Sequence, residues 1–453
     1  MKNPFNKHLC CFLVVIAGAG LAGSASLQPS PAPDISKFLV PVQDLPIRAE
    51  MPDVMVMCDG TKVTTPEQWR QRREEMKQIL EFYELGHAPP PPGNVTGQDL
   101  QSRDVLAGAA RFRLVHLKFG PGEKLGIDVA IFTPANGNGP FPTIINPSFS
   151  ATPGVAPAGN PSSQTAARGT NAPVVPPRGN RSSQTSASAT NFPTGPIGSP
   201  DPERAAAGFS NLLARGYAIL TYRYTQCGAD DATFRSSTFF PAYPDYDWGV
   251  LASWAWGLSR CVDYLETQPF ADTNKLIALG HSRLGKLTMV ATAFDERIAL
   301  GAPAGSSGAG TGAYRFCGPG RGGKEGFEDM TRKFPWYFVP RAKEFTGQIQ
   351  KLPFDAHWFI ALTAPRPWIS VEGMDDQNCV PNAVRQSVLA ARPVYQFLGV
   401  STNRVGVNYD PHSHFLTQGD WTAALDFADQ QLRGLDHQRK FDQFPPEPAP
   451  AQR

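Results

Sequence analysis

Short apolar runs alternate with stretches of helical spacing along most of the 453-residue chain. The runs that predict β-strands are Ile127–Phe132, Thr143–Ile145, Ala218–Tyr222, Leu276–Leu279, Trp368–Val371 and Arg404–Val407. A helix is predicted from Thr65 to about Leu85, because a capping Thr is followed by Pro in the first turn and then by Glu and Gln. Two more helices are predicted at Val250–Leu265 and Trp421–Leu432. This order predicts an α/β fold, with a mainly parallel sheet that helices cover on both faces.

Three segments interrupt this pattern and bound a predicted catalytic domain of residues 51–436. Residues 26–50 form a Pro-rich arm before it, and residues 437–453 form a Pro-rich tail after it. Inside the domain, residues 151–200 are rich in Ser, Thr, Pro, Gly and Ala, and Gly159-Asn-Pro-Ser-Ser-Gln-Thr recurs there as Gly179-Asn-Arg-Ser-Ser-Gln-Thr. Two copies are too few for a solenoid, so we interpret the insertion as a duplicated surface loop. A lid or a wall for a polymeric substrate and a merely tolerated insertion are equally compatible with it.

The first residues have the layout of a secretory signal peptide. Lys2 and Lys7 precede an apolar run from Leu9 to about Leu21, and small residues follow up to Ala25. This run is shorter than the roughly 20 residues that a bilayer span needs. We therefore expect residues 1–25 to be removed, and the chain to be secreted or periplasmic with no membrane span.

Charge and cysteine content exclude several classes of function. Lys plus Arg is 42 and Asp plus Glu is 40, and the net charge of +2 provides no field for nucleic acid or an acidic membrane. None of the cysteines beyond the signal peptide belongs to a C-x-x-C pair, so we expect no metal site. We also expect that the protein needs no cofactor and is a monomer. Cys317 and Cys379 follow two segments that should both approach the site, and we predict a disulfide between them.

The strongest chemical motif is Leu276-Ile-Ala-Leu-Gly-His-Ser-Arg-Leu-Gly-Lys, in which an apolar strand leads into Gly280-x-Ser282 and then a helix. A sharp strand-to-helix turn needs glycines, and it presents the Ser hydroxyl beside the free amides of the helix N-terminus. Because Leu284 intervenes, the spacing is G-x-S-x-x-G and departs from the usual G-x-S-x-G. The motif alone is equally compatible with a Gly-rich turn in which Ser282 caps a helix.

An acid and a histidine follow Ser282 in the chain order typical of α/β-hydrolases. The loop Glu372-Gly-Met-Asp-Asp-Gln-Asn-Cys-Val-Pro comes after one predicted strand, and Tyr409-Asp-Pro-His-Ser-His-Phe-Leu-Thr comes after the last. A Ser hydroxyl needs an imidazole to take its proton, and a carboxylate orients that imidazole. We predict Asp376 and His414 for these roles.

The neighbouring polar residues have simpler alternative interpretations. For Asp375 and Glu372 the alternative is a solvated acidic turn, and for His412 it is a hydrogen bond that stabilises its loop.

Together with this motif, further segments of the chain resemble the glucuronoyl esterases of carbohydrate esterase family fifteen. The segments are Asp59-Gly-Thr-Lys-Val-Thr-Thr-Pro-Glu-Gln-Trp, Trp254-Ala-Trp-Gly-Leu-Ser-Arg, Leu352-Pro-Phe-Asp-Ala-His, Ala364-Pro-Arg-Pro and His414-Phe-Leu-Thr-Gln-Gly-Asp-Trp. The resemblance covers about Met57 to Leu432. It implies an α/β-hydrolase fold and hydrolysis of the ester that joins 4-O-methyl-glucuronic acid of glucuronoxylan to lignin alcohols, so the expected substrate is a lignin-carbohydrate ester.

The resemblance also implies roles for individual residues. It makes Ser282 the nucleophile, Arg283 the oxyanion-stabilising residue, and Lys286 and Glu325 contacts to sugar hydroxyls. The chemistry of Arg283 agrees, because a guanidinium next to the nucleophile can stabilise negative charge on the carbonyl oxygen. For Lys286, the sequence without the resemblance favours a solvated helix residue.

Two positions depart from the family pattern. Many members carry the acid as a Glu where this chain has Ser306, so Asp376 on the later loop must supply it. Asn378 stands where a sugar-contacting Trp is usual, which leaves the uronate preference open, although Trp336 could approach the sugar from elsewhere in the fold. Two other functions therefore compete: an esterase for acetyl or feruloyl groups of the plant cell wall, and a catalytically silent carbohydrate-binding protein.

Overall fold

The computed structural model describes residues 33–137, 139–155, 199–318, 320–321 and 323–444. The predicted signal peptide and almost all of the predicted insertion lie outside these residues. Within the part that is described, no helix has the length and apolar character to cross a membrane.

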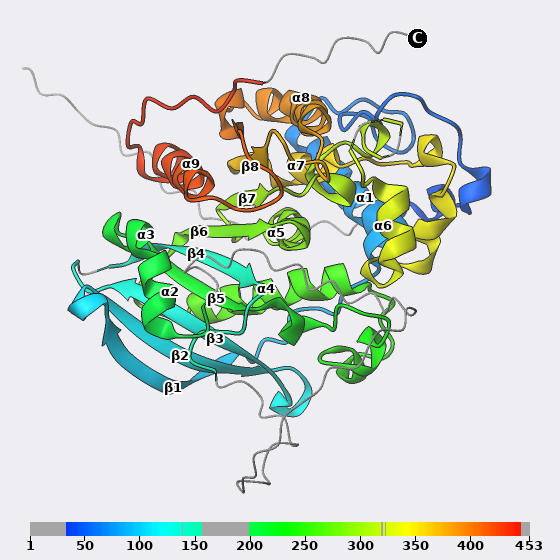
Figure 1. The fold of residues 1–453 in the computed structure, drawn as a ribbon. Coiled ribbons are helices and arrows are strands. Elements are labelled where there is room, and N and C mark those ends of the chain that lie inside the picture. Colours follow the sequence, from blue (N-terminus) through cyan, green and yellow to red (C-terminus); the bar gives the residue numbers. More distant parts are fainter. Residues whose placement is uncertain (1–32, 138, 156–198, 319, 322, 445–453) are drawn as a thin grey trace, which may run out of the picture.

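A nine-stranded sheet forms the centre of the molecule, in the order β1-β2-β3-β5-β4-β6-β7-β8-β9 (Figure 1). The strands are β1 (Thr96–Val105), β2 (Ala110–Phe119), β3 (Leu125–Pro134), β4 (Phe141–Ser148), β5 (Ala218–Arg223), β6 (Ala271–His281), β7 (Leu300–Ala304), β8 (Trp368–Gly373) and β9 (Val405–Asp410). Pairing is antiparallel from β1 to β3 and between β3 and β5, and parallel through the rest of the sheet. Because parallel strands end at the same edge, the loops after β4, β6, β7, β8 and β9 meet there.

Helices cover both faces of the sheet, as the sequence pattern predicts (Figure 1). They are α1 (Pro66–Leu80), α2 (Pro202–Gly208), α3 (Ser210–Ala214), α4 (Val250–Leu265), α5 (Arg283–Phe294), α6 (Phe327–Lys333), α7 (His357–Thr363), α8 (Pro381–Phe397) and α9 (Gln418–Ala428). Helices α2, α3 and α9 pack in one apolar cluster with the sheet, and α1, α4, α5, α7 and α8 pack in the other. The predicted α/β architecture is therefore confirmed.

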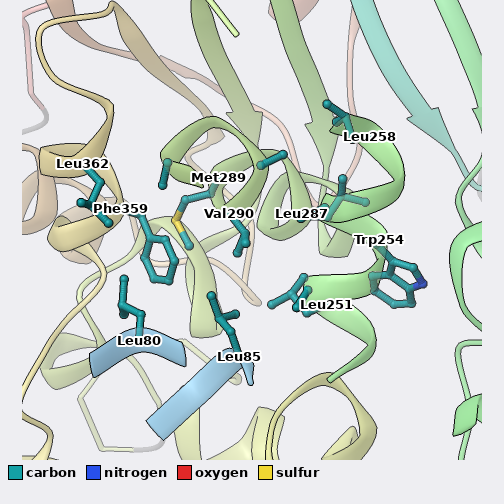
Figure 2. Close-up of a cluster of buried hydrophobic side chains, with 14 of the residues drawn as sticks. Leu80, Leu85, Leu251, Trp254, Leu258, Leu287, Met289, Val290, Phe359 and Leu362 are labelled. Atoms are coloured by element: carbon teal, nitrogen blue, oxygen red, sulfur yellow. The ribbon is translucent and has the colours of Figure 1, made fainter. Parts of the chain in front are cut away.

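The larger cluster fixes α5, the helix that directly follows Ser282. Figure 2 shows side chains of α4, α5 and α7 in one cluster with Leu80 and Leu85. Nearly every residue of α4 is buried, Trp254 and Leu258 among them. A helix that is apolar on most sides belongs inside a domain, and here α4 holds α5 against the sheet.

Helix α1 starts and stops as its sequence predicts. The hydroxyl of Thr65 accepts a hydrogen bond from the amide of Gln68, and the Gln68 side chain accepts one from Thr65 in return. After α1, Glu81–Leu85 forms one wider π-helical turn that ends at Gly86, where φ is 76°. A side chain at Gly86 would collide with the backbone of Trp248, so glycine both ends this helix and allows close packing.

Both flanking segments pack against the domain where they are described. Ile35, Val42 and Leu45 of the predicted arm are buried in the larger cluster. Phe441, within the predicted tail, is buried against Phe427 of α9, and its carbonyl accepts a hydrogen bond from the Val407 amide. The packed chain thus continues beyond residue 436.

Candidate active site

Ser282 lies at the turn between β6 and α5, in a strained conformation with φ 60° and ψ −126°. A non-glycine residue rarely adopts a positive φ, and such strain is typical of the nucleophile turn of hydrolases. Added side chains at Gly280 and Gly285 would collide with the Leu284 carbonyl and the Ser306 hydroxyl, respectively. The second glycine of the shifted G-x-S-x-x-G spacing therefore lies where α5 passes closest to Gly280 and to the residues that end β7.

Three predicted residues from distant loops meet at this turn. His414, in the loop after β9, accepts a hydrogen bond at Nε2 from the Ser282 hydroxyl, with 2.9 Å between the two atoms. On its other side, His414 Nδ1 donates to Asp376 Oδ2 at 2.5 Å. A hydroxyl, an imidazole and a carboxylate in this order can transfer the hydroxyl proton to the imidazole.

Asp376 is held in its charged form by the loop after β8. Its Oδ1 accepts hydrogen bonds from the amides of Asn378, at 2.8 Å, and Cys379, at 3.3 Å. Burial opposes the charge, but the hydrogen bond and positive charge of His414, together with the Asn378 amide, leave the pKa of Asp376 below its usual value. The adjacent Asp375 is exposed, and its backbone amide donates to the His412 carbonyl.

Glu372, which the sequence equally allowed as part of a solvated turn, is completely buried at the end of β8. Its Oε1 accepts hydrogen bonds from the hydroxyls of Ser370 and Thr311, whereas Oε2 has no partner among the described residues. Burial raises the pKa of Glu372 to about 8. A carboxyl that stays neutral at pH 7 does not compete with Asp376 for the positive charge of His414.

His412 has the loop-stabilising contacts that we named as its alternative role. Its Nδ1 donates to the Ser413 carbonyl at 2.8 Å, and its Nε2 lies 3.1 Å from Asp420 Oδ1. Asp420 also caps α9 by accepting hydrogen bonds from Thr417. These contacts of His412 connect the loop to α9 and orient His414, two residues later, toward Ser282.

His281, the variable residue of the turn motif, was missed as a site residue. Its ring lies 4.8 Å from that of His414, centroid to centroid. Burial, and then the neighbouring charge of His414, lower the pKa of His281 to about 3. A permanently neutral ring can support His414 without repelling the imidazolium that forms during proton transfer. The turn motif could have indicated this position, because its middle residue flanks the nucleophile.

Arg283 lies directly after Ser282 and forms an ion pair with Asp230. Asp230 also accepts hydrogen bonds from the Tyr224 hydroxyl, at 2.7 Å, and from Trp336 Nε1, at 3.0 Å. Burial alone would lower the pKa of Arg283, but its interactions with Tyr337 and Asp230 outweigh this effect and raise the pKa above its usual value. The guanidinium therefore stays charged. Sequence reasoning missed Asp230, because its loop has no catalytic motif and only the fold brings it to Arg283.

Lys286 and Glu325 lie on the side of Ser282 that faces the loop after β7. Lys286 is buried, and its Nζ donates to the Ser306 carbonyl at 3.3 Å. Burial lowers the pKa of Lys286, and Glu325 opposes this effect. Glu325 is partly exposed and lies 3.7 Å from Lys333 Nζ. Lys286 is thus not the solvated helix residue that the sequence alone also allowed.

Ser306, one of the two positions that depart from the expected family pattern, supports the turn. Its hydroxyl donates to the Ser282 carbonyl.

The predicted disulfide between Cys317 and Cys379 is wrong, because both thiols are free. Each contacts Ser307: Cys317 Sγ lies 3.3 Å from its hydroxyl, and Cys379 Sγ accepts from its amide at 3.3 Å. Both cysteines thus contact Ser307 as free thiols instead of bonding to each other.

Asp376, Cys379 and His414 also form a group whose potential ligand atoms lie within 4.8 Å of one another. Two ligands on one zinc ion, each at about 2 Å from it, would be about 3.3 Å apart in tetrahedral geometry. The 2.5 Å between Asp376 and His414 is a direct hydrogen bond and leaves no room for an ion between them. The group therefore fits proton transfer better than metal binding.

Comparison with known proteins adds independent information. The family model "Glucuronyl esterase, fungi" matches residues 178–399. A carbohydrate esterase from an unknown prokaryotic organism is 30% identical over 85% of this chain and 90% of its own length. A 4-O-methyl-glucuronoyl methylesterase from Phanerochaete carnosa is 28% identical over 85% of this chain and 82% of its own length. A solved glucuronoyl esterase of carbohydrate esterase family fifteen, from Caldicellulosiruptor kristjansonii, superposes with a TM-score of 0.68 at 28% identity, covering 90% of this chain and 97% of its own.

Proposed function

The chain belongs to carbohydrate esterase family fifteen, the glucuronoyl esterases, and from this premise we propose that it hydrolyses the ester between 4-O-methyl-glucuronic acid of glucuronoxylan and a lignin alcohol. The observation that carries the proposal is the chain of hydrogen bonds from Ser282 through His414 to Asp376 at a strained strand-to-helix turn. Family membership makes the protein a carboxylic ester hydrolase, and the proposal assigns its residues and substrate.

In the first half of the reaction, His414 Nε2 takes the hydroxyl proton while Ser282 Oγ attacks the carbonyl carbon of the ester. Asp376 stabilises the imidazolium and keeps the proton on Nδ1. When the tetrahedral intermediate collapses, the bond to the alcohol oxygen breaks, and His414 returns the proton to the leaving alcohol. Water, deprotonated by His414, then attacks the acyl enzyme and releases the uronic acid and Ser282.

Negative charge on the carbonyl oxygen is stabilised by Arg283. Its backbone amide belongs to the residue after the nucleophile, a usual donor in this fold, and its guanidinium adds a positive charge held beside the turn. Asp230 restricts the orientations of that guanidinium, because two further donors, the Tyr224 hydroxyl and Trp336 Nε1, fix its carboxylate. Such preorganisation lowers the barrier without any rearrangement during the reaction.

The uronic acid ring is proposed to lie on the side of Lys286 and Glu325. The Lys286 ammonium can donate to sugar hydroxyls, and the partly exposed Glu325 carboxylate can accept from them. Trp336, the candidate replacement for the Trp absent at Asn378, is engaged with Asp230 through its indole nitrogen. That hydrogen bond involves the edge of the indole and not its face, so the sugar contacts proposed here are the polar ones of Lys286 and Glu325.

A panel of model esters tests this function against the two competing ones. The protein should convert benzyl glucuronate to free glucuronic acid and benzyl alcohol, with far lower kcat/KM on acetylated xylose and on methyl ferulate. Preference for either of the latter would favour another plant-wall esterase. If none of the three esters is hydrolysed faster by the wild-type protein than by a Ser282→Ala preparation, the silent carbohydrate-binding protein is favoured.

Asp230→Asn tests the support of Arg283. Loss of the negative charge of Asp230 should free the Arg283 guanidinium and lower kcat for benzyl glucuronate roughly tenfold. This decrease is smaller than the one expected when an oxyanion donor itself is removed. KM should change little, because Asp230 is not placed to touch the sugar. Tyr224→Phe, which removes one donor but keeps the charge of Asp230, should have a smaller effect. A wild-type kcat for Asp230→Asn would contradict the role of this ion pair.

A further inference from the structure

Phe149 is an exposed aromatic side chain at the active-site edge of the sheet. It follows β4 directly, and 46% of its surface is accessible to solvent. Its ring lies edge to face with that of Tyr224 at 5.6 Å, and the Arg283 guanidinium lies 5.9 Å from its centroid. These contacts fix one side of the ring beside the residue that follows the nucleophile, and leave the remainder free for another molecule.

The sheet order determines which part of the ester lies near Phe149. Strand β6, which carries Ser282, runs between β4 on one side and β7 on the other. Lys286 contacts the loop after β7, because its Nζ donates a hydrogen bond to the Ser306 carbonyl. Glu325 packs closely on Gly308 of the same loop: a Cβ atom added at Gly308 would lie 2.9 Å from the Cβ of Glu325. The proposed sugar contacts are thus all on the β7 side.

The acyl and alcohol parts of an ester diverge from the carbonyl carbon that Ser282 attacks, so they leave that carbon on different sides. With the sugar on the β7 side, the alcohol extends toward β4. We propose that Phe149 contacts the aromatic ring of the leaving alcohol and makes the enzyme prefer esters of aryl-alkyl alcohols over those of small alkyl alcohols. This inference rests on the proposed function, and it adds a specificity residue on the alcohol side of the same site.

A comparison of two leaving groups tests it, with kcat/KM measured for benzyl glucuronate and methyl glucuronate. Aromatic pairs of this kind contribute enough to change the preference about three- to tenfold. Phe149→Ala should lower the benzyl-to-methyl ratio by this factor, and Phe149→Tyr, which keeps the ring, should retain the wild-type ratio. Leu100→Ala, at an exposed apolar residue of β1, is the matched control and should also retain it.

The ratio separates the possible failures. Any disturbance of Arg283 by Phe149→Ala affects both esters and cancels in the ratio. An unchanged ratio in Phe149→Ala, with both esters hydrolysed by the wild-type protein, would overturn the inference and leave the proposed function standing. A wild-type protein that hydrolyses neither ester would overturn the proposed function itself.

Discussion

Replacing Ser282 with alanine should lower kcat for benzyl glucuronate by several orders of magnitude, on the order of 10⁴- to 10⁶-fold. The hydroxyl is the group that His414 deprotonates, and no other hydroxyl contacts Nε2 among the described residues. Alanine keeps the backbone conformation of the turn, so the thermal unfolding temperature should stay close to that of the wild-type protein. Both quantities are measured on the same purified variant.

Ser282→Gly is the matched control for the strained backbone. Glycine adopts a positive φ without strain, so this variant should be as inactive as Ser282→Ala but more stable, by about 1 kcal/mol. Activity above a few per cent of wild type in the alanine variant, with unchanged thermal stability, would rule out Ser282 as the nucleophile.

Asp376→Asn should lower kcat by roughly a hundredfold or more with little change in KM. An amide nearly preserves the shape of the carboxylate, but it removes the charge that stabilises the imidazolium of His414. It also permits the wrong tautomer of His414, because an amide nitrogen can donate to Nδ1. Steady-state kinetics with benzyl glucuronate measure both parameters.

Asp375→Asn is the control in the same loop, and it should change kcat much less. Asp375 is exposed, and no hydrogen bond links its carboxylate to His414. If the two effects were reversed, Asp375 would be the acid. If neither variant lost activity, the loop after β8 would not supply the acid at all.

The residues that take part in proton transfer could be predicted from the sequence because their positions follow chain order. Ser282 ends a strand with a recognisable turn, and Asp376 and His414 lie in loops after later strands. The fold brings the ends of parallel strands together, so order along the chain indicates proximity in space.

The groups that support these residues could not be predicted in the same way. Asp230 lies in a loop without a motif, and its role depends on Tyr224 and Trp336 converging from other segments. Glu372 differs little in sequence from a solvated acid, and its burial follows from its place at the end of β8, a strand that is paired on both sides. Burial and convergence are properties of tertiary packing, which local sequence does not contain.

The fold shows the same division. Helix α4 was predicted with its observed bounds, because apolar residues predominate along its whole length. Strand β1 was missed, because nearly all of its residues are exposed and polar and it is held by backbone pairing with β2. Strand β7 was also missed, because its five residues are small and include a proline. Pairing partners, rather than their own sequences, make both segments strands.

The central claim is that this site selects a uronic acid on the acyl side of the ester. It is tested most directly by kcat/KM of the wild-type protein for benzyl glucuronate relative to benzyl acetate, because the two esters share their leaving alcohol and differ only in the acyl group. Contacts of the sugar with Lys286 and Glu325 predict a large preference for the glucuronate. Equal values, or a preference for the acetate, would contradict the account.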